Sequence, residues 1–315
     1  MSENLKIVFA GTPEIAKIIL EKILASGFNV ELILTKPDSI AGRGKKLTPS
    51  AVKELALKYG ISVLTPVSLR KNIDTVEQIR SIQPDIMIVV AYGLILPQEI
   101  LDIPRLGCVN IHVSLLPRHR GAAPILRSVL EGDKTSGITI IQMDSGLDTG
   151  DVLLQTIVEL GQAETSGTLH DKLAILGSDL IIEYLYNYSK ITPMPQSRVG
   201  VTYAHKIEKQ EAKIDWNQDV GSIDRQIRAF NPFPGAFCYL KNELVKVWRA
   251  DTLLGGNTQV EAGTITAASG DGVMVAVKNG SILIQELQFS GKKRISAKEY
   301  LNGAKNIELI GQKYT

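Results

Sequence analysis

The segment 107–117, Gly-Cys-Val-Asn-Ile-His-Val-Ser-Leu-Leu-Pro, carries the side chains best suited to chemistry. If it is a β-strand that Pro117 closes, the two-residue period places Asn110 and His112 on one face, near its carboxyl end. Two polar side chains inside a sheet are unfavourable unless they are hydrogen-bonded or serve a reaction. An amide donor can stabilise an oxyanion, and an imidazole can move a proton. The alternative is a purely structural, hydrogen-bonded pair.

A glycine-punctuated loop downstream carries three carboxylates, Asp144, Asp148 and Asp151. Loop carboxylates are usually solvated, and spacing alone does not choose among these three. Gly146 and Gly150 bracket Asp148, which indicates a tightly shaped backbone at that position.

The first half of the chain alternates short apolar runs with amphipathic helical stretches. This pattern predicts βαβ units and a Rossmann-like, open, mostly parallel sheet, with the ligand crevice beyond the carboxyl ends of the strands. A glycine fingerprint for a dinucleotide is missing after the first strand, where Gly11 is followed by Thr12 and Pro13, so an NAD-dependent dehydrogenase is excluded. We expect strands at 5–10, 30–35, 61–64, 85–91 and 138–143, with helices from 14 and over 50–59 and 76–81.

The pattern changes near residue 190, where a short proline-rich linker begins. One helix is expected over 222–230, and short strands with glycine turns follow it, as is typical of a small OB-like β-barrel. The expected strands are 236–240, 243–249, 263–267, 272–277 and 281–289. The predicted fold class is therefore α/β, with a catalytic domain over 1–190, a linker over 191–207 and a C-terminal barrel over 208–315.

The composition is that of a globular protein. The chain has 315 residues, 44% hydrophobic and 22% charged, which suits two domains. Cys108 and Cys238 lie far apart among apolar or small neighbours, so we expect buried free thiols, a reducing compartment and no metal site. No signal peptide or membrane span is visible, and we expect a cytoplasmic monomer. Residues 191–315 hold 16 basic and 12 acidic residues, a bias too small to decide the partner.

Taken together, Asn110, His112, residues 114–117 and residues 147–150 resemble the folate-dependent formyltransferases. The resemblance implies that Asn110, His112 and Asp148 are the catalytic residues. They would move a formyl group from 10-formyltetrahydrofolate to an amine, without a metal. It leaves open whether His112 or Asp148 is the formal base.

Four further motifs, at 9–14, 41–46, 118–124 and 230–236, are similar to the branch of that family that formylates methionine on initiator methionyl-tRNA. The sequence departs from that branch at two places. Residues 38–40 read Asp-Ser-Ile where relatives often have Arg-Pro, and His119 stands where a bulky aromatic is common. Neither departure touches the three catalytic positions, and the second leaves open whether His119 packs in the site or faces solvent.

The resemblance also implies two binding surfaces. The folate is expected at the end of the 85–91 strand and in the turn after His112, against Val90, Ala91, Tyr92, Gly93, Ser114, Leu115, Leu116 and Pro117. For Tyr92 a place at the edge of the core is an equal alternative. The glycine-rich loop 36–46 is expected to order on tRNA, and the residues expected to contact it are Arg43, Lys45, Lys46, Lys206 and Lys209.

Two other functions stay open at this point. The same catalytic domain could act on a small amine, such as a glycinamide ribonucleotide or an amino-sugar nucleotide, although such an acceptor needs neither the basic loop nor the barrel. The chain could also be a nucleic-acid-binding module without activity, although the intact Asn110, His112 and Asp148 speak against that.

Overall fold

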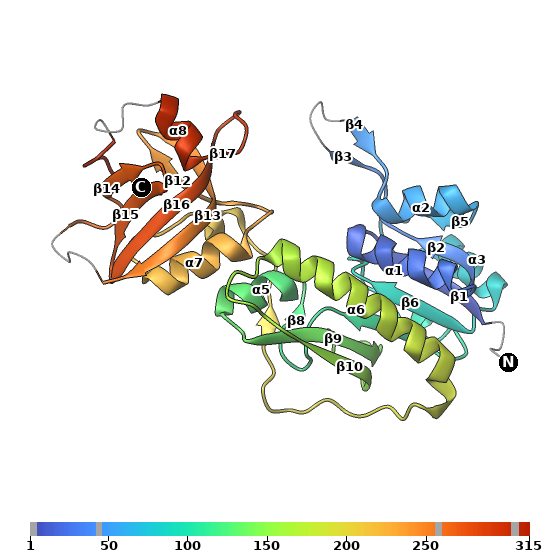
Figure 1. Cartoon of the computed structure of the whole chain (residues 1–315). Coiled ribbons are helices and arrows are strands. Elements are labelled where there is room, and N and C mark those ends of the chain that lie inside the picture. The colour runs from blue at the N-terminus through green and yellow to red at the C-terminus, as the bar shows by residue number, and fades with distance from the viewer. Residues whose placement is uncertain (1–4, 42–45, 256–259, 304–308) are drawn as a thin grey trace. The chain divides into compact units, whose positions relative to one another are not determined.

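The computed structural model describes residues 5–41, 46–255, 260–303 and 309–315 (Figure 1). By its internal contacts the chain divides into two compact units. The first unit consists of Met1–Pro124, Thr135–Glu159 and His170–His205, and the second of Ile125–Lys134, Leu160–Leu169 and Lys206–Thr315. Two short segments that precede residue 190 thus pack with the C-terminal unit. The division into 1–190, 191–207 and 208–315 stays a prediction.

A seven-stranded sheet forms the centre of the first unit. Its order is β10-β9-β7-β6-β1-β2-β5, and the five strands from β5 to β7 are parallel to one another. β9 pairs antiparallel with β7, and β10 pairs antiparallel with β9. The strands are β1 (Lys6–Gly11), β2 (Asn29–Leu34), β5 (Ser62–Leu64), β6 (Ile86–Val90), β7 (Cys108–His112), β9 (Thr135–Gln142) and β10 (Val152–Glu159). The predicted open, mostly parallel sheet is confirmed.

Helices cover both faces of this sheet, which explains why β6 is a continuous apolar run with every residue buried. On one face lie α1 (Glu14–Ala25), with α2 (Ala51–Tyr59) beside it, and α6 (Ser166–Asn187). A Cβ at Gly177 of α6 would lie 3.2–3.5 Å from Ile19, Ile111 and Ile138. On the other face α3 (Ile73–Ile82) and α4 (Gln98–Leu101) share a buried cluster with β6.

The strand order reverses between β1 and β6, and this is where an open α/β sheet forms its ligand crevice. The Thr12 hydroxyl donates to the Tyr92 carbonyl oxygen at 3.1 Å and joins the carboxyl ends of these two strands. A Cβ at Gly11 would lie 2.7 Å from the Cβ of Ala16, so glycine lets the strand turn directly into α1, whose N-cap is Pro13. The turn therefore serves packing, as expected from the missing dinucleotide fingerprint.

Two short pairings complete the first unit. β3 (Ser39–Ala41) and β4 (Lys46–Thr48) pair antiparallel on either side of 42–45, which lie outside the described residues. β8 (Arg120–Gly121) pairs in parallel with β11 (Tyr203–Ala204). The second pairing brings residues from the predicted linker beside the loop that follows β7.

The second unit is an antiparallel barrel, as predicted. Its strand order is β12-β13-β16-β15-β14, with β17 (Ile295–Ser296) on β16. The strands are β12 (Ala236–Leu240), β13 (Glu243–Leu254), β14 (Ile265–Ser269), β15 (Gly272–Val277) and β16 (Gly280–Phe289). The two edge strands are joined by the C-terminal tail, because Thr315 pairs with Tyr239 of β12 and Tyr314 donates to Gly263 just before β14.

Helices and aromatic side chains fill this barrel and cover it. Val220, Ile223 and Ile227 line one face of α7 (Val220–Ala229) and are buried in the core. Trp216 and Tyr314 stack there with their ring centroids 5.7 Å apart. The unit also holds α5 (Pro124–Glu131), α8 (Ala297–Gly303) and the 3-10 helix η2 (Lys209–Ala212). In the described part of the chain, no helix is long and apolar enough to cross a membrane.

Truncating the tail side chain that closes the barrel should destabilise the second unit. Tyr314 is 1% exposed, so Tyr314→Ala is expected to lower the free energy of unfolding by about 3–5 kcal/mol. Both tryptophans of the chain, Trp216 and Trp248, belong to this unit, so tryptophan fluorescence during urea unfolding follows it selectively. Ile310→Ala is the matched control, because Ile310 is half exposed, and it should change stability by less than about 0.5 kcal/mol. Equal effects would contradict the closing role of Tyr314.

Candidate active site

β7 brings the two polar side chains of the 107–117 segment to the carboxyl edge of the sheet. Asn110 lies opposite Ile141 of β9, and His112 lies opposite Thr139. The strand ends at His112 and not at Pro117, because the Thr139 hydroxyl donates to the Ser114 carbonyl and accepts from the Leu116 N–H. The chain therefore turns immediately after His112, and Asn110 and His112 lie where the crevice of the fold is expected.

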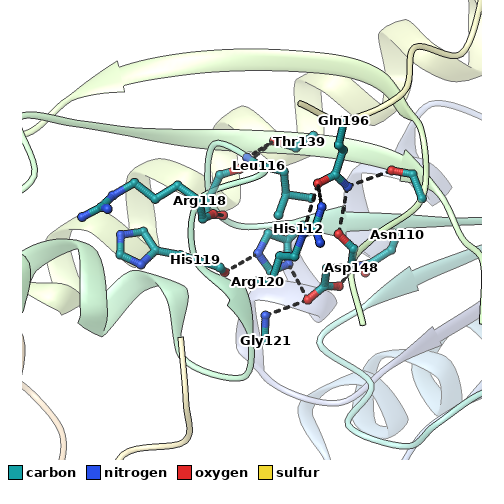
Figure 2. Close-up of polar contacts among 12 residues, drawn as sticks. Asn110, His112, Leu116, Arg118, His119, Arg120, Gly121, Thr139, Asp148 and Gln196 are labelled. Carbon is teal, nitrogen blue, oxygen red and sulfur yellow. Dashed lines mark hydrogen bonds and ion pairs between the residues drawn. The ribbon is translucent and has the colours of Figure 1, made fainter. Parts of the chain in front are cut away.

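Asp148 joins these two residues (Figure 2). One carboxylate oxygen, Oδ1, accepts from Nδ2 of Asn110 at 3.2 Å. The other, Oδ2, accepts from the backbone N–H of Gly121 at 2.8 Å and lies 3.6 Å from Nδ1 of His112. Of the three residues that the resemblance selected, Asp148 thus contacts both of the others.

The structure also distinguishes Asp148 from the two other aspartates of its loop. Asp144 accepts from the Gly146 N–H at 2.9 Å and from the Thr149 hydroxyl at 2.7 Å, so its carboxylate shapes the loop. Asp151 is exposed. The tight backbone predicted around Asp148 is present: its φ is +52°, and a Cβ on Gly150 would lie 1.7 Å from the carbonyl oxygen of Gln142.

The hydrogen bonds of His112 determine its tautomer. Nε2 lies 2.9 Å from the carbonyl oxygen of His119, and since a carbonyl oxygen only accepts, Nε2 carries the proton. In the neutral ring, Nδ1 is then the unprotonated nitrogen, and it faces Asp148. Burial lowers the pKa of His112 below 6.5, and this effect outweighs the Asp148 charge and the bond to the His119 carbonyl, which raise it. A charge on the His119 ring would also lower it.

His119 is buried, which answers the question that its unusual residue type left open. Its side chain is 2% exposed and its φ is +61°. Its N–H donates to the Thr202 hydroxyl at 2.9 Å, while its carbonyl holds His112. His119 therefore contributes backbone groups to the site.

Sequence reasoning missed the groups other than Asn110 and His112 that contact Asp148 or its loop. The Gly121 N–H is a backbone group, which carries no side-chain signal. Gln196 contacts the backbone of the Asp148 loop, and its amide oxygen accepts from Arg120 at 2.7 Å (Figure 2). The only available signal was a polar residue directly after Pro195 in a segment interpreted as a linker.

The residues expected to bind folate lie at the carboxyl ends of the paired strands β6 and β7: Val90 ends β6, and the others lie in the loops that follow the two strands. Tyr92 is 2% exposed and lies in an apolar cluster, which is the place in the core that the sequence left as an equal alternative. Ala91 and Gly93 are exposed, with φ values of +44° and +76°. The other positions are buried (Val90, Ser114, Leu116) or half-buried (Leu115, Pro117).

The residues expected to bind tRNA are divided between the units. Arg43 and Lys45 lie outside the described residues. Lys46 is exposed on β4 of the first unit. Lys206 and Lys209 are exposed in the second unit, Lys209 at the start of η2. Their grouping into one surface stays a prediction.

Both cysteines are free and buried, as expected. Burial raises the pKa of the Cys108 thiol to about 12, and it raises the pKa of Cys238 as well. A thiol that stays protonated at neutral pH is a poor nucleophile. The cysteines therefore pack in the cores of the two units.

Comparison with known proteins identifies the family of the chain. The model of the formyl transferase family matches residues 5–185, and that of the formyl transferase C-terminal domain matches residues 206–305. The chain belongs to the formyl transferase family and is a formyl-transferring enzyme.

Two curated relatives are similar over nearly their whole length, and both are named methionyl-tRNA formyltransferase. The one from Aromatoleum aromaticum is 50% identical over 301 residues, covering 95% of this chain and 94% of its own. The one from Chromobacterium violaceum is 49% identical over 299 residues, covering 95% and 96%.

Solved structures share the fold at low sequence identity. A variant of HypX from Aquifex aeolicus gives a TM-score of 0.66 at 16% identity, over 98% of this chain and 50% of that chain. The sugar 3N-formyl transferase WlaRD, solved in the presence of dTDP and 5-N-formyl-THF, gives 0.63 at 20% identity, over 92% of this chain and all of its own.

The environment of His112 predicts its titration. We expect a pKa below 6.5, with the proton of the neutral ring on Nε2, as measured by ¹⁵N NMR of the histidine rings. Asp148→Asn should lower the pKa further, because the carboxylate that favours the charged ring is lost. Since the folded-state pKa lies below the unfolded value of 6.5, neutral His112 supports the fold above about pH 6.5. This support is lost as the pH falls through the folded-state pKa. A proton on Nδ1 of the neutral ring would contradict the tautomer.

Proposed function

We propose that this enzyme transfers the formyl group of 10-formyltetrahydrofolate to the α-amino group of methionine on initiator methionyl-tRNA. The observation that carries the chemistry is the contact of Asn110 and His112 with the Asp148 carboxylate at the carboxyl edge of the sheet. The acceptor is supported by the identity of about half of all residues to relatives named for it, over 95% of the chain. The two buried free thiols fit a reducing compartment such as the cytoplasm.

Asn110 has the chemistry of an oxyanion donor. The Asp148 carboxylate accepts one of its two amide N–H bonds, which leaves the second for the formyl oxygen. When the acceptor amine attacks the formyl carbon, the C–N bond forms and negative charge develops on that oxygen. A donor already aimed at this position stabilises the tetrahedral intermediate more than the substrate.

His112 has the chemistry of a proton carrier. Nδ1 of the neutral ring takes the proton that the amine loses on attack, and the Asp148 carboxylate stabilises the imidazolium that results. When the intermediate collapses, the bond from the formyl carbon to N10 of the folate breaks and N10 receives the proton. The products are the formylated acceptor and tetrahydrofolate, and His112 returns to its neutral form.

The folate site is supported by the backbone at the end of β6. Ala91 and Gly93 are exposed, so their N–H and C=O groups are available to the edge of a flat, hydrogen-bonding ring. The Thr12 hydroxyl engages the Tyr92 carbonyl, which joins this loop to the end of β1. The residues therefore fit a pterin that backbone groups recognise beside the apolar residues 115–117.

Single-turnover transfer from 10-formyltetrahydrofolate tests this proposal. We expect fast product on methionyl initiator tRNA and none above background on free methionine, glycinamide ribonucleotide or an amino-sugar nucleotide. Product on a small amine alone would retain the chemistry and overturn the tRNA acceptor.

The Asn110→Ala variant separates chemistry from binding. It should lower the rate of this turnover about 10²–10³-fold, because one oxyanion donor is lost. Its affinity for methionyl-tRNA should stay within about twofold of wild type. Retained turnover in this variant would show that Asn110 is not the oxyanion donor.

The basic residues at the start of the second unit predict a salt-dependent contribution to tRNA binding. Lys206→Glu combined with Lys209→Glu should weaken tRNA binding and reduce the slope of log K against log salt by about 2, since two phosphate contacts are lost. Filter binding at several salt concentrations measures both effects.

The control for the change in net charge is Lys58→Glu combined with Lys190→Glu, at two exposed lysines of the first unit. This control should leave the slope unchanged. An equal loss of tRNA affinity in both double variants would show that the effect comes from net charge alone. Lys206 and Lys209 would then not belong to the binding surface.

A further inference from the structure

We propose that Gln196 is the residue that positions Asp148 for catalysis, acting through the backbone of the Asp148 loop. This inference rests on the proposed role of Asp148 in formyl transfer. Gln196 touches neither Asn110 nor His112 in any hydrogen bond of the described structure, and its side chain reaches the site only through main-chain carbonyls. It is therefore a positioning residue.

The amide of Gln196 joins two backbone carbonyl groups of the Asp148 loop. Its Nε2 donates to the carbonyl oxygen of Asp148 and to the carbonyl oxygen of Gly150, each at 2.8 Å (Figure 2). Both N–H bonds of the side chain are thereby used on the carbonyls of the two residues that flank Thr149. The bond pair fixes the separation and the direction of these two carbonyls.

The loop needs this support because Asp148 has an unfavourable backbone conformation. Its φ of +52° is left-handed, a region that residues other than glycine adopt only at a cost in free energy. If the loop relaxed to negative φ, the carboxylate would swing away from the Gly121 N–H and from Nδ1 of His112. The donors of Gln196 bind both carbonyls in the left-handed form and so stabilise it.

Arg120 determines which end of the Gln196 side chain faces the loop. Its Nε and Nη2 donate to the Gln196 Oε1 at 3.2 and 2.7 Å. A flipped amide would set its NH₂ group against the guanidinium and its oxygen against two carbonyl oxygens. The orientation of the amide is therefore determined by its partners.

The segment that carries Gln196 is held on both sides of it. Before it, Met194 and Val152 exchange two backbone hydrogen bonds, of 2.7 and 2.9 Å. After it, the carbonyl of Thr202 accepts from the Arg120 N–H at 2.9 Å, and β11 pairs with β8. The backbone on both sides of Gln196 is thus fixed by hydrogen bonds, as a positioning residue requires.

The test is the Gln196→Glu variant, which keeps an oxygen for Arg120 but replaces the two N–H donors by an oxygen that faces two carbonyls. We expect kcat to fall about 10–100-fold, as a small misplacement of a catalytic group does, with KM for both substrates within about twofold. The pKa of His112, followed by ¹⁵N NMR, should fall as the Asp148 carboxylate moves away. The second variant, Arg120→Met, should change kcat and the His112 pKa in the same direction by a smaller amount.

Gln226→Glu is the matched control. Its Nε2 also donates to two backbone carbonyls, those of Glu211 and Lys213 at 2.7 and 2.9 Å, but all three residues belong to the second unit. We expect a similar fall in melting temperature in both glutamate variants, with kcat and the His112 pKa changed only by Gln196→Glu.

Two outcomes separate this inference from the proposed function. If Gln196→Glu lowers only the melting temperature, as the control does, the positioning role is overturned. If the wild-type chain does not formylate methionyl-tRNA, the proposed acceptor fails. The His112 titration then still decides whether Gln196 holds Asp148 in place, because it needs no substrate.

Discussion

The Asp148 carboxylate is the group on which the arrangement of the site depends. It accepts from the Asn110 amide on β7 and from the Gly121 N–H on β8, and it lies 3.6 Å from Nδ1 of His112 at the end of β7. A half-buried carboxylate is stable there only because hydrogen bonds replace the water that it loses. The same contacts bring together Asn110, the proposed oxyanion donor, and His112, the proposed proton carrier. Folding energy and catalytic geometry therefore depend on one set of interactions.

The sequence was most informative where side-chain pattern and burial coincide. The Ile- and Val-rich β6, the shared face of Asn110 and His112, and the antiparallel barrel all follow from periodicity and turn residues. Asp148 did not follow from pattern, because three aspartates share its loop. The family resemblance chose it, and the structure adds a physical reason, since Asp144 is engaged by its own loop.

The parts that could not be predicted are made by backbone groups or by distant pairings. The Gly121 N–H and the His119 carbonyl have no side-chain signature, yet one holds Asp148 and the other determines the tautomer of His112. The early end of β7 depends on the Thr139 hydroxyl, which comes from a strand later in the sequence. The tail that closes the barrel pairs through only a few residues, too few for a strand pattern.

The predicted linker shows why composition alone misjudges such a segment. Pro193 and Pro195 suggested a spacer, but proline also fixes an extended backbone without an N–H of its own. Between them only Met194 is left to pair, and it does so with Val152. The extended path then carries Gln196 to the carbonyls of the Asp148 loop. Residues as far as His205 belong to the first unit, so most of this segment is part of a folded unit and not a free spacer.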